Sequence, residues 1–288
     1  MSDSQFKEKL LYLHYMNVLS NKQLLLWLQA DPALERPLSN PPVSVKLTPH
    51  QSQKISSCLF SATYKEIESH LTQSRTSFIT IFDELYPERL REIYDPPVIL
   101  YSRGNINLLN NTNQLAVIGS RNADSYTERT LECILPGLMR RGVGIVSGMA
   151  KGADGIAHSL ALGAETIGII GSGFHYQYPR CNHDLYEAMI KKQLLLSEYP
   201  PYIKPQKFHF PMRNRIIAGI SRGLLVTQAA IKSGTMITVD RALEEGRDVF
   251  AVPGPIFNIL SEGTNSLINQ GAKLTVSALD IIDEWRIK

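Results

Sequence analysis

The residue types best suited to chemistry in this 288-residue sequence gather between Glu198 and Asp240, where no other acidic side chain occurs. Cations and aromatic rings are interspersed over this interval, and they are Lys204, Lys207, Phe208, His209, Phe210, Arg213, Arg215, Arg222 and Lys232. Cationic side chains bind phosphates and flat rings stack on unpaired bases, so this composition favours contact with a single strand of nucleic acid. A solvated basic loop beside a core helix would contain the same residues, and this interval alone leaves both interpretations open.

Further candidate phosphate contacts lie in turns that follow short apolar runs or open helices. The turns are rich in small residues and contain Gly119, Ser120, Arg121, Lys151, Gly171, Ser172, Gly173, Ser233, Gly234 and Thr235. Glycine lets a phosphate approach the backbone, and the amides at a helix start favour an anion. A tight strand-to-helix connection explains any one of these turns, whereas four turns at one sheet edge indicate a shared binding cleft.

The signals for catalysis are weaker. Asp154 and His158 lie four residues apart on one expected helix and could form an acid–base or metal pair. A helix-capping aspartate and a buried, hydrogen-bonded histidine explain them as well, and we favour that interpretation. Glu198 follows a strand end and is the carboxylate most able to face the cleft. The sequence has no P-loop, complete dinucleotide fingerprint or HExxH motif, so we expect no enzyme, no cofactor and no metal.

The elements that must position these residues form a regular series. Apolar runs without alternation recur between helical patterns at Leu115–Ile118, Gly144–Val146, Thr166–Ile170, Leu194–Leu196, Leu224–Val226 and Val249–Val252. This series predicts an α/β fold with a mostly parallel sheet covered on both faces. Two earlier strands are expected at Phe78–Ile81 and Val98–Tyr101. Ligands of such sheets bind beyond the carboxyl ends of the strands, where the turns described above lie.

Residues 1–72 have a different composition and predict a small helical domain, followed by a larger domain over residues 73–288. Helical spacing of apolar residues occurs over Phe6–Leu28 and Thr48–Leu71, with four prolines between the two stretches. The formal net charge is only +3, so any nucleic-acid contact must be a local patch.

Three cysteines, Cys58, Cys133 and Cys181, are too widely spaced to suggest a zinc site or a disulfide framework. No apolar run reaches the length of a membrane span, and the first residues lack the features of a signal peptide. We therefore expect a cytoplasmic protein that does not enter a membrane.

Several blocks between residues 78 and 274 resemble the DNA-processing protein A family, also called DprA or Smf. The blocks are AVIGSR at 116–121, VSGMAKGAD at 146–154, YPRCN at 178–182, SEYP through FPMRNRIIAG at 197–219, SGT at 233–235, GRDVFAVPG at 246–254 and NSLINQGA at 265–272. The resemblance implies an extended Rossmann-like fold preceded by a small helical, SAM-like domain. Gln228 departs from the pattern, because a glutamate is expected there.

The same resemblance implies a bacterial protein that binds single-stranded DNA in natural transformation. Such a protein loads the RecA recombinase onto incoming strands, often displacing single-strand binding protein, and forms a homodimer. By motif position, the implied DNA-facing residues are Gly119, Ser120, Arg121, Lys207, Phe210, Arg213, Asn214 and Arg215, with the turn Ser233–Thr235 nearby. Ile268 and Leu274 are expected at the dimer and RecA-facing surface. Arg213 or Arg215 could instead be a structural cation paired with Glu198.

Two alternatives remain. A nucleoside-monophosphate hydrolase of the lysine-decarboxylase-like Rossmann group resembles this chain at the glycine-rich turn that opens a helix. Thr238 occupies the position of the working glutamate of those hydrolases, so no carboxylate there could activate water. A structural scaffold for RecA with incidental DNA affinity is the second alternative.

Overall fold

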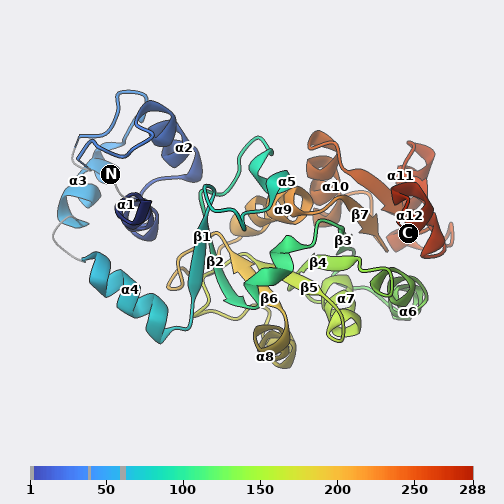
Figure 1. Ribbon diagram of the computed structural model, residues 1–288. Helices are drawn as coiled ribbons and strands as arrows, with labels where there is room; N and C mark the ends of the chain where they lie inside the picture. Colours follow the sequence, from blue (N-terminus) through green and yellow to red (C-terminus); the bar gives the residue numbers. More distant parts are fainter. Residues whose placement is uncertain (1–2, 38–39, 59–62, 288) are drawn as a thin grey trace.

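The computed structural model describes residues 3–37, 40–58 and 63–287, which form one broad sheet with helices on both faces and further helices at one end (Figure 1). The predicted α/β class with a mostly parallel sheet is confirmed. The helices of the described chain do not include one that is both long and apolar enough to cross a membrane.

The amino-terminal helices are α1 (Asp3–Tyr15), α2 (Asn21–Ala30), α3 (Pro49–Cys58) and α4 (Tyr64–Gln73), as the helical spacing predicted. Ser20 and Thr63 begin α2 and α4 with capping boxes, in which the side chain and a residue three positions later satisfy each other's backbone groups. Trp27 and other apolar residues of these helices share a hydrophobic cluster with Ile99 and Tyr101 of β2 and with Val98, which precedes that strand. The helices therefore pack on the sheet, and the predicted domain boundary after residue 72 stays a prediction.

The strands are β1 (Ser77–Thr80), β2 (Ile99–Gly104), β3 (Gln114–Ile118), β4 (Gly144–Gly148), β5 (Thr166–Ile170), β6 (Leu194–Ser197), β7 (Gly223–Val226), β8 (Asp248–Ala251) and β9 (Lys273–Leu274). Their order across the sheet is β1-β2-β6-β5-β4-β3-β7-β8-β9. Across the sheet from β6 through β3 to β9, all neighbouring strands are parallel. At the other edge, β1 pairs with β2 and β2 with β6 in antiparallel fashion.

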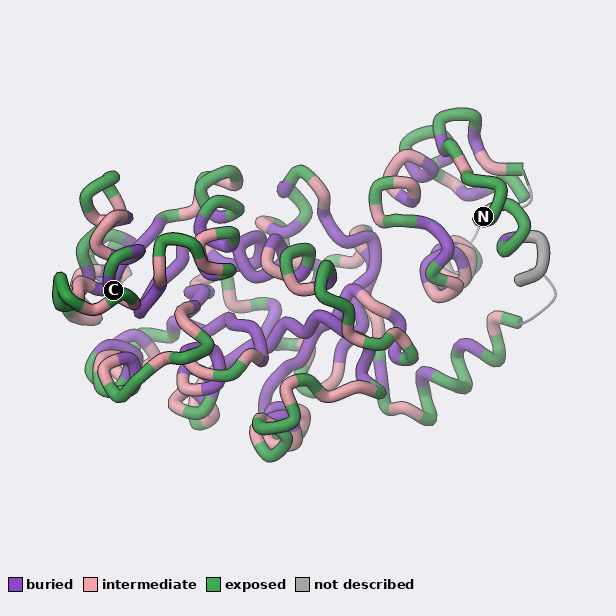
Figure 2. The backbone as a smooth tube through the Cα atoms, turned by 180° about the vertical axis from the view of Figure 1, so that it is seen from behind, coloured by how far each residue is buried: buried purple, intermediate pink, exposed green. Residues whose placement is uncertain are grey.

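The remaining helices are α5 (Glu88–Arg91), α6 (Ser125–Met139), α7 (Ala153–Ala161), α8 (His183–Lys192), α9 (His209–Ile220), α10 (Gly234–Glu244), α11 (Ile259–Asn269) and α12 (Leu279–Trp285), with short 3-10 turns at Ile106–Asn110 and Arg180–Asn182. Alternate residues of β3 point to opposite faces of the sheet. Ala116 and Ile118 pack in the cluster of α9 and α10, whereas Leu115 and Val117 pack with α6, α7 and α12. Figure 2 shows buried backbone along the central strands, as two covered faces require.

The order of the strands creates one switch point. From β3 the chain proceeds through β4, β5 and β6 on one side, and then returns to place β7 on the other side of β3. The connections after β3 and β7 consequently diverge to opposite faces and leave a crevice between them at the carboxyl ends of the strands. The sheet thus positions a site beside the turn that follows β3.

Candidate nucleic-acid interface

A cleft of about 660 Å³ lies at this switch point. The turns after β3 and β4 and the first turns of α9 and α10 line it. Ten residues predicted from the sequence are among its walls: Gly119, Ser120, Arg121, Lys207, Phe210, Arg213, Asn214, Ser233, Gly234 and Thr235. The cleft also has walls that the sequence did not indicate as contacts, including Asn122, Tyr178, Ile237 and Leu260. Among its described lining residues, Asp154 carries the one carboxylate.

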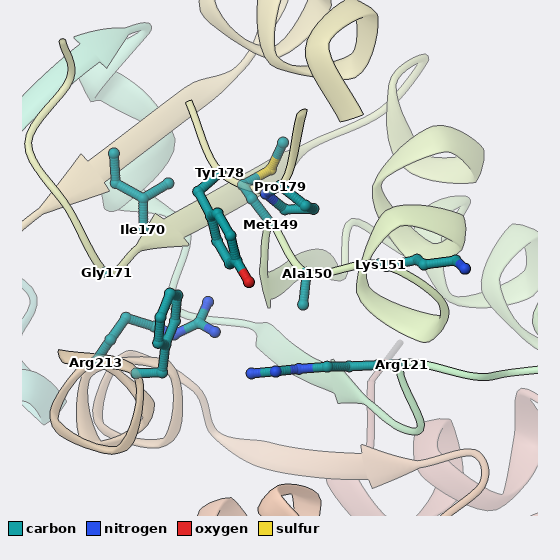
Figure 3. Close-up of a pocket in the computed structure, with 10 residues that line it drawn as sticks. Arg121, Met149, Ala150, Lys151, Ile170, Gly171, Tyr178, Pro179 and Arg213 are labelled. Atoms are coloured by element: carbon teal, nitrogen blue, oxygen red, sulfur yellow. The ribbon is translucent and has the colours of Figure 1, made fainter. Parts of the chain in front are cut away.

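A smaller recess of about 60 Å³ opens beside the cleft and is lined by two aromatic rings and two guanidinium groups. The rings of Tyr178 and Phe210 have centroids 5.3 Å apart, and the Arg121 guanidinium lies 5.8 Å from the Phe210 centroid. Figure 3 shows Tyr178, Arg121 and Arg213 converging on the same space, whereas the Lys151 side chain extends away from it. Flat apolar walls with cations beside them suit a planar ring attached to a phosphate.

Arg213 forms the buried floor of this recess. Its Nη1 donates to the Ile169 carbonyl at 2.6 Å, and its Nε is without a hydrogen-bond partner among the described residues. Burial raises the pKa of the Asp154 carboxyl, and the Arg213 guanidinium opposes that rise. A side chain at Gly148 has no room between them, because its Cβ would lie 1.9 Å from Arg213 Nη1. Gly148 therefore permits the approach of the arginine to the end of β4.

The start of α10 forms the opposite wall. Thr235 Oγ1 donates to the Gly119 carbonyl at 3.0 Å, which fixes the helix start against the turn after β3. Ser233 occupies the N-cap position without a side-chain cap, and its buried Oγ has no partner among the described residues. The amides of the first helical turn and the helix dipole favour an anion at this wall.

Residues 77–286 match the family model of the DNA recombination-mediator protein A. This chain belongs to that family. It is 40% identical over 275 residues to DNA processing protein DprA of Bacillus subtilis, and the match covers 93% of this chain and 91% of the relative. It is 45% identical over 232 residues to DprA of Streptococcus pneumoniae, with coverage of 79% and 82%. The family expected from the sequence blocks is confirmed.

Solved structures agree with the family assignment. The crystal structure of Streptococcus pneumoniae DprA superposes with a TM-score of 0.86 at 38% identity, covering 96% of this chain and 97% of that one. A structure of DprA from Helicobacter pylori superposes with a TM-score of 0.67 at 30% identity, covering 74% and 97%, and it describes the single-stranded DNA binding mode of that protein.

Arg215 of this DprA-family chain lies outside the cleft, although it is only two residues from Arg213. Its Nη2 donates to Glu198 Oε1 at 2.5 Å, and its Nε lies 3.4 Å from Asp95 Oδ2. All but 5% of Arg215 and 7% of Glu198 is buried. The structural role, one of the two left open by the sequence, fits Arg215, whereas a DNA contact does not. The expectation that Glu198 faces the cleft is wrong for the same reason.

The predicted turn at 171–173 reaches the site only through its first residue. Gly171 lines the recess, with Phe210 against it. Ser172 is buried and donates to the Tyr176 carbonyl, and Gly173 donates its N–H to the Ile203 carbonyl at 2.8 Å. The loop at 199–203 covers Gly173, and the Ser172 hydroxyl is buried in a bond within its own loop, which corrects the predicted DNA contact of both residues.

His158 of this family member is structural, as we favoured from the sequence. Its Nδ1 lies 2.7 Å from Thr166 Oγ1 and its Nε2 lies 2.7 Å from the Gly148 carbonyl. Complete burial lowers the pKa of His158 to about 4. The imidazole is consequently neutral at pH 7 and joins β4 to β5. The described residues form no cluster of histidine, cysteine and acidic side chains suited to a metal ion.

Gln228, which replaces the glutamate expected from the family pattern, lies behind the cleft. Its Oε1 accepts hydrogen bonds from Thr127 Oγ1 at 2.7 Å and from the Asp124 N–H at 3.4 Å. Both partners lie at the start of α6, so the amide joins the loop after β7 to that helix. The substitution thus preserves an acceptor for α6 without placing a charge in the interior.

The two residues predicted for the dimer and RecA-facing surface differ in exposure. Ile268 is partly buried against the core, whereas Leu274 is 50% exposed on the edge strand β9. Val276 and Leu279 nearby are 61% and 59% exposed. We call Leu274, Val276 and Leu279 the edge patch.

Proposed function

We propose that this protein binds single-stranded DNA in the cleft, with one unpaired base in the recess, stacked against the rings of Tyr178 and Phe210 that line it. The recess carries the proposal, because its two ring walls and its buried Arg213 suit a base while Arg121 lies beside it for a phosphate. A base in a duplex remains paired and stacked and could not enter. The single-stranded DNA binding mode described for the Helicobacter pylori relative supports the same choice of ligand.

The phosphates on either side of that base would contact different walls. Arg121 and Lys207 are exposed cations at the cleft, and the amino terminus of α10 supplies backbone N–H groups opposite them. Lys151 lines the recess, but its side chain extends away from it, so we assign the ammonium group to a neighbouring phosphate (Figure 3). Affinity would then fall steeply with salt, because each neutralised phosphate releases counterions.

We further propose that the protein is a cytoplasmic recombination mediator without a catalytic step, which loads RecA onto incoming single strands in natural transformation. Thr238 lines the cleft where the hydrolase hypothesis requires a carboxylate, and Asp154 is held beside Arg213. Both observations support binding rather than hydrolysis.

The mediator role predicts that this protein accelerates RecA assembly on DNA coated with single-strand binding protein. Assembly can be followed by RecA-dependent ATP hydrolysis with the wild type and with Arg121→Ala. We expect acceleration by the wild type and little by the variant, because the variant holds the strand poorly. No acceleration by a wild type that binds the strand would contradict the mediator role and leave DNA binding intact.

We propose a homodimer through the edge patch, because an uncovered edge strand with exposed apolar side chains favours association. Leu274→Glu is expected to convert the dimer to a monomer in sedimentation velocity, since a charge would be buried at the interface. Val43→Glu, at a side chain that is 94% exposed in the amino-terminal part, is the matched control. A dimer that survives Leu274→Glu would place the interface elsewhere.

A further inference from the structure

The loop from Tyr199 to Phe208 carries a cation and a ring that do not line the cleft. Lys207 lines the cleft, but Lys204 and Phe208 are not among its described lining residues. Lys204 is exposed, and Phe208 is 61% exposed. At the other side of the loop, Tyr202 Oη donates to the Tyr15 carbonyl of α1. The loop therefore extends from the cleft to the amino-terminal helices.

The exposed ring of Phe208 has rigid support behind it. It meets His209 edge to face at 4.6 Å, and His209 stacks on Tyr199 at 4.0 Å. His209 Nδ1 lies 3.2 Å from the Gly171 carbonyl, so the imidazole is fixed to the end of β5. A ring held in this way loses little conformational entropy when a ligand stacks on its free face.

The backbone of the loop is fixed as well. The Gly173 N–H donates to the Ile203 carbonyl at 2.8 Å, and the His175 N–H donates to the Pro201 carbonyl at 3.0 Å. The loop is therefore attached to the segment that follows β5 and holds Lys204, Lys207 and Phe208 at defined positions beside the cleft.

We propose that Phe208 is a second stacking platform and that Lys204 and Lys207 guide the single strand from the cleft over this loop toward the amino-terminal helices. The proposal rests on the single-stranded DNA binding described above and adds a direction to it. The charge pattern favours a polyanion over a protein partner, because no acidic residue occurs between Glu198 and Asp240. Cations beside an exposed ring offer a phosphate contact and a base contact in succession.

Tryptophan fluorescence can report stacking at this ring directly. Phe208→Trp adds one exposed indole to a chain whose Trp27 and Trp285 are 0% and 4% exposed. We expect a long oligothymidylate to quench the new emission at the concentration that saturates binding in anisotropy. Tyr94→Trp is the control, because Tyr94 is 89% exposed and its N–H bonds to Glu245 at the far end of α10 from the cleft. The control should show no quenching.

Removal of the Phe208 ring provides the second test. Phe208→Ala is expected to weaken binding of the long oligothymidylate by about tenfold, the loss typical of one stacked base, and to leave binding of a thymidine dinucleotide unchanged. Normal binding of Phe208→Trp in anisotropy without quenching of its emission would overturn the proposed path of the strand and leave the proposed function standing. No oligonucleotide binding by the wild type would overturn both. A change of oligomeric state in Phe208→Ala with unchanged DNA binding would assign the ring to a protein contact and overturn the path.

Discussion

Arg121→Ala is expected to weaken single-stranded DNA binding by at least about tenfold. Arg121 lies on the turn after β3, lines both the cleft and the recess, and approaches the face of Phe210. The variant loses a phosphate contact and the cation beside the bound base. Fluorescence anisotropy at several salt concentrations should also give a slope of log affinity on log salt that is smaller by about 0.7, the change for one phosphate contact.

The control for this experiment is Arg140→Ala. Arg140 is an exposed cation that caps the carboxyl end of α6, at the other end of the helix from the cleft. Arg140→Ala removes the same charge as Arg121→Ala but lies away from the cleft, so a general electrostatic effect on DNA binding would appear in both variants. Equal losses in both variants, or no loss in Arg121→Ala, would remove Arg121 from the proposed site.

Arg215→Met is expected to lower the free energy of unfolding by about 3–5 kcal/mol, because it leaves the buried Glu198 carboxylate without its cation. The ion pair is largely buried, and the Arg215 guanidinium connects α9 to Glu198 and Asp95. Denaturant unfolding measures the loss. Single-stranded DNA affinity of the folded variant should remain close to that of the wild type, since Arg215 is not among the described residues that line the cleft.

An exposed ion pair provides the comparison. Arg241 Nη1 lies 2.7 Å from Glu244 Oε2, with half or more of each side chain in solvent. Arg241→Met should change the free energy of unfolding by less than about 1 kcal/mol. A second variant that combines Arg215→Met with Glu198→Leu should recover part of the stability, because it removes the stranded carboxylate. If Arg215→Met were no more costly than Arg241→Met, the structural role of Arg215 would be wrong.

The fold could be predicted from local sequence because parallel strands covered on both faces are continuous apolar runs. Leu115–Ile118 and Thr166–Ile170 are such runs, and each became a central strand. β9 was missed, because two exposed residues, Lys273 and Leu274, carry no pattern. The antiparallel pairing of β2 with β6 was also absent from the prediction, since pairing between distant strands leaves no trace in either strand alone.

The candidate site was predicted where the turns themselves form it. Gly119 to Arg121 and Ser233 to Thr235 lie at the cleft because strand and helix ends fix them there. The sequence could not tell which of Arg213 and Arg215 faces the cleft. Side chains two positions apart on a helix point about 200° away from each other, and local sequence does not give the orientation of the helix on the sheet. The prediction for Gly173 was wrong because the loop at 199–203 covers it, and the prediction for Ser172 was wrong because its side chain is buried.

Tyr178 is a residue of the recess for which the sequence carried a signal. It lies on the loop between β5 and α8, far in sequence from Phe210, yet the two rings form the walls of the recess. The YPRCN block was recognised only as a family feature, and an exposed aromatic in such a block is a signal for binding. The contact itself follows from tertiary packing and needed the structure.

An unpaired base bound in the recess requires that the protein prefer a single strand to a duplex of the same sequence. Anisotropy of one labelled oligonucleotide would be measured with the wild-type protein, first as a single strand and then annealed to its complement. We predict tight binding of the single strand and much weaker binding of the duplex, because only an unpaired base can enter the recess lined by Tyr178 and Phe210. Equal affinity for both would show that the protein contacts only the DNA backbone and would contradict the binding of an unpaired base in the recess.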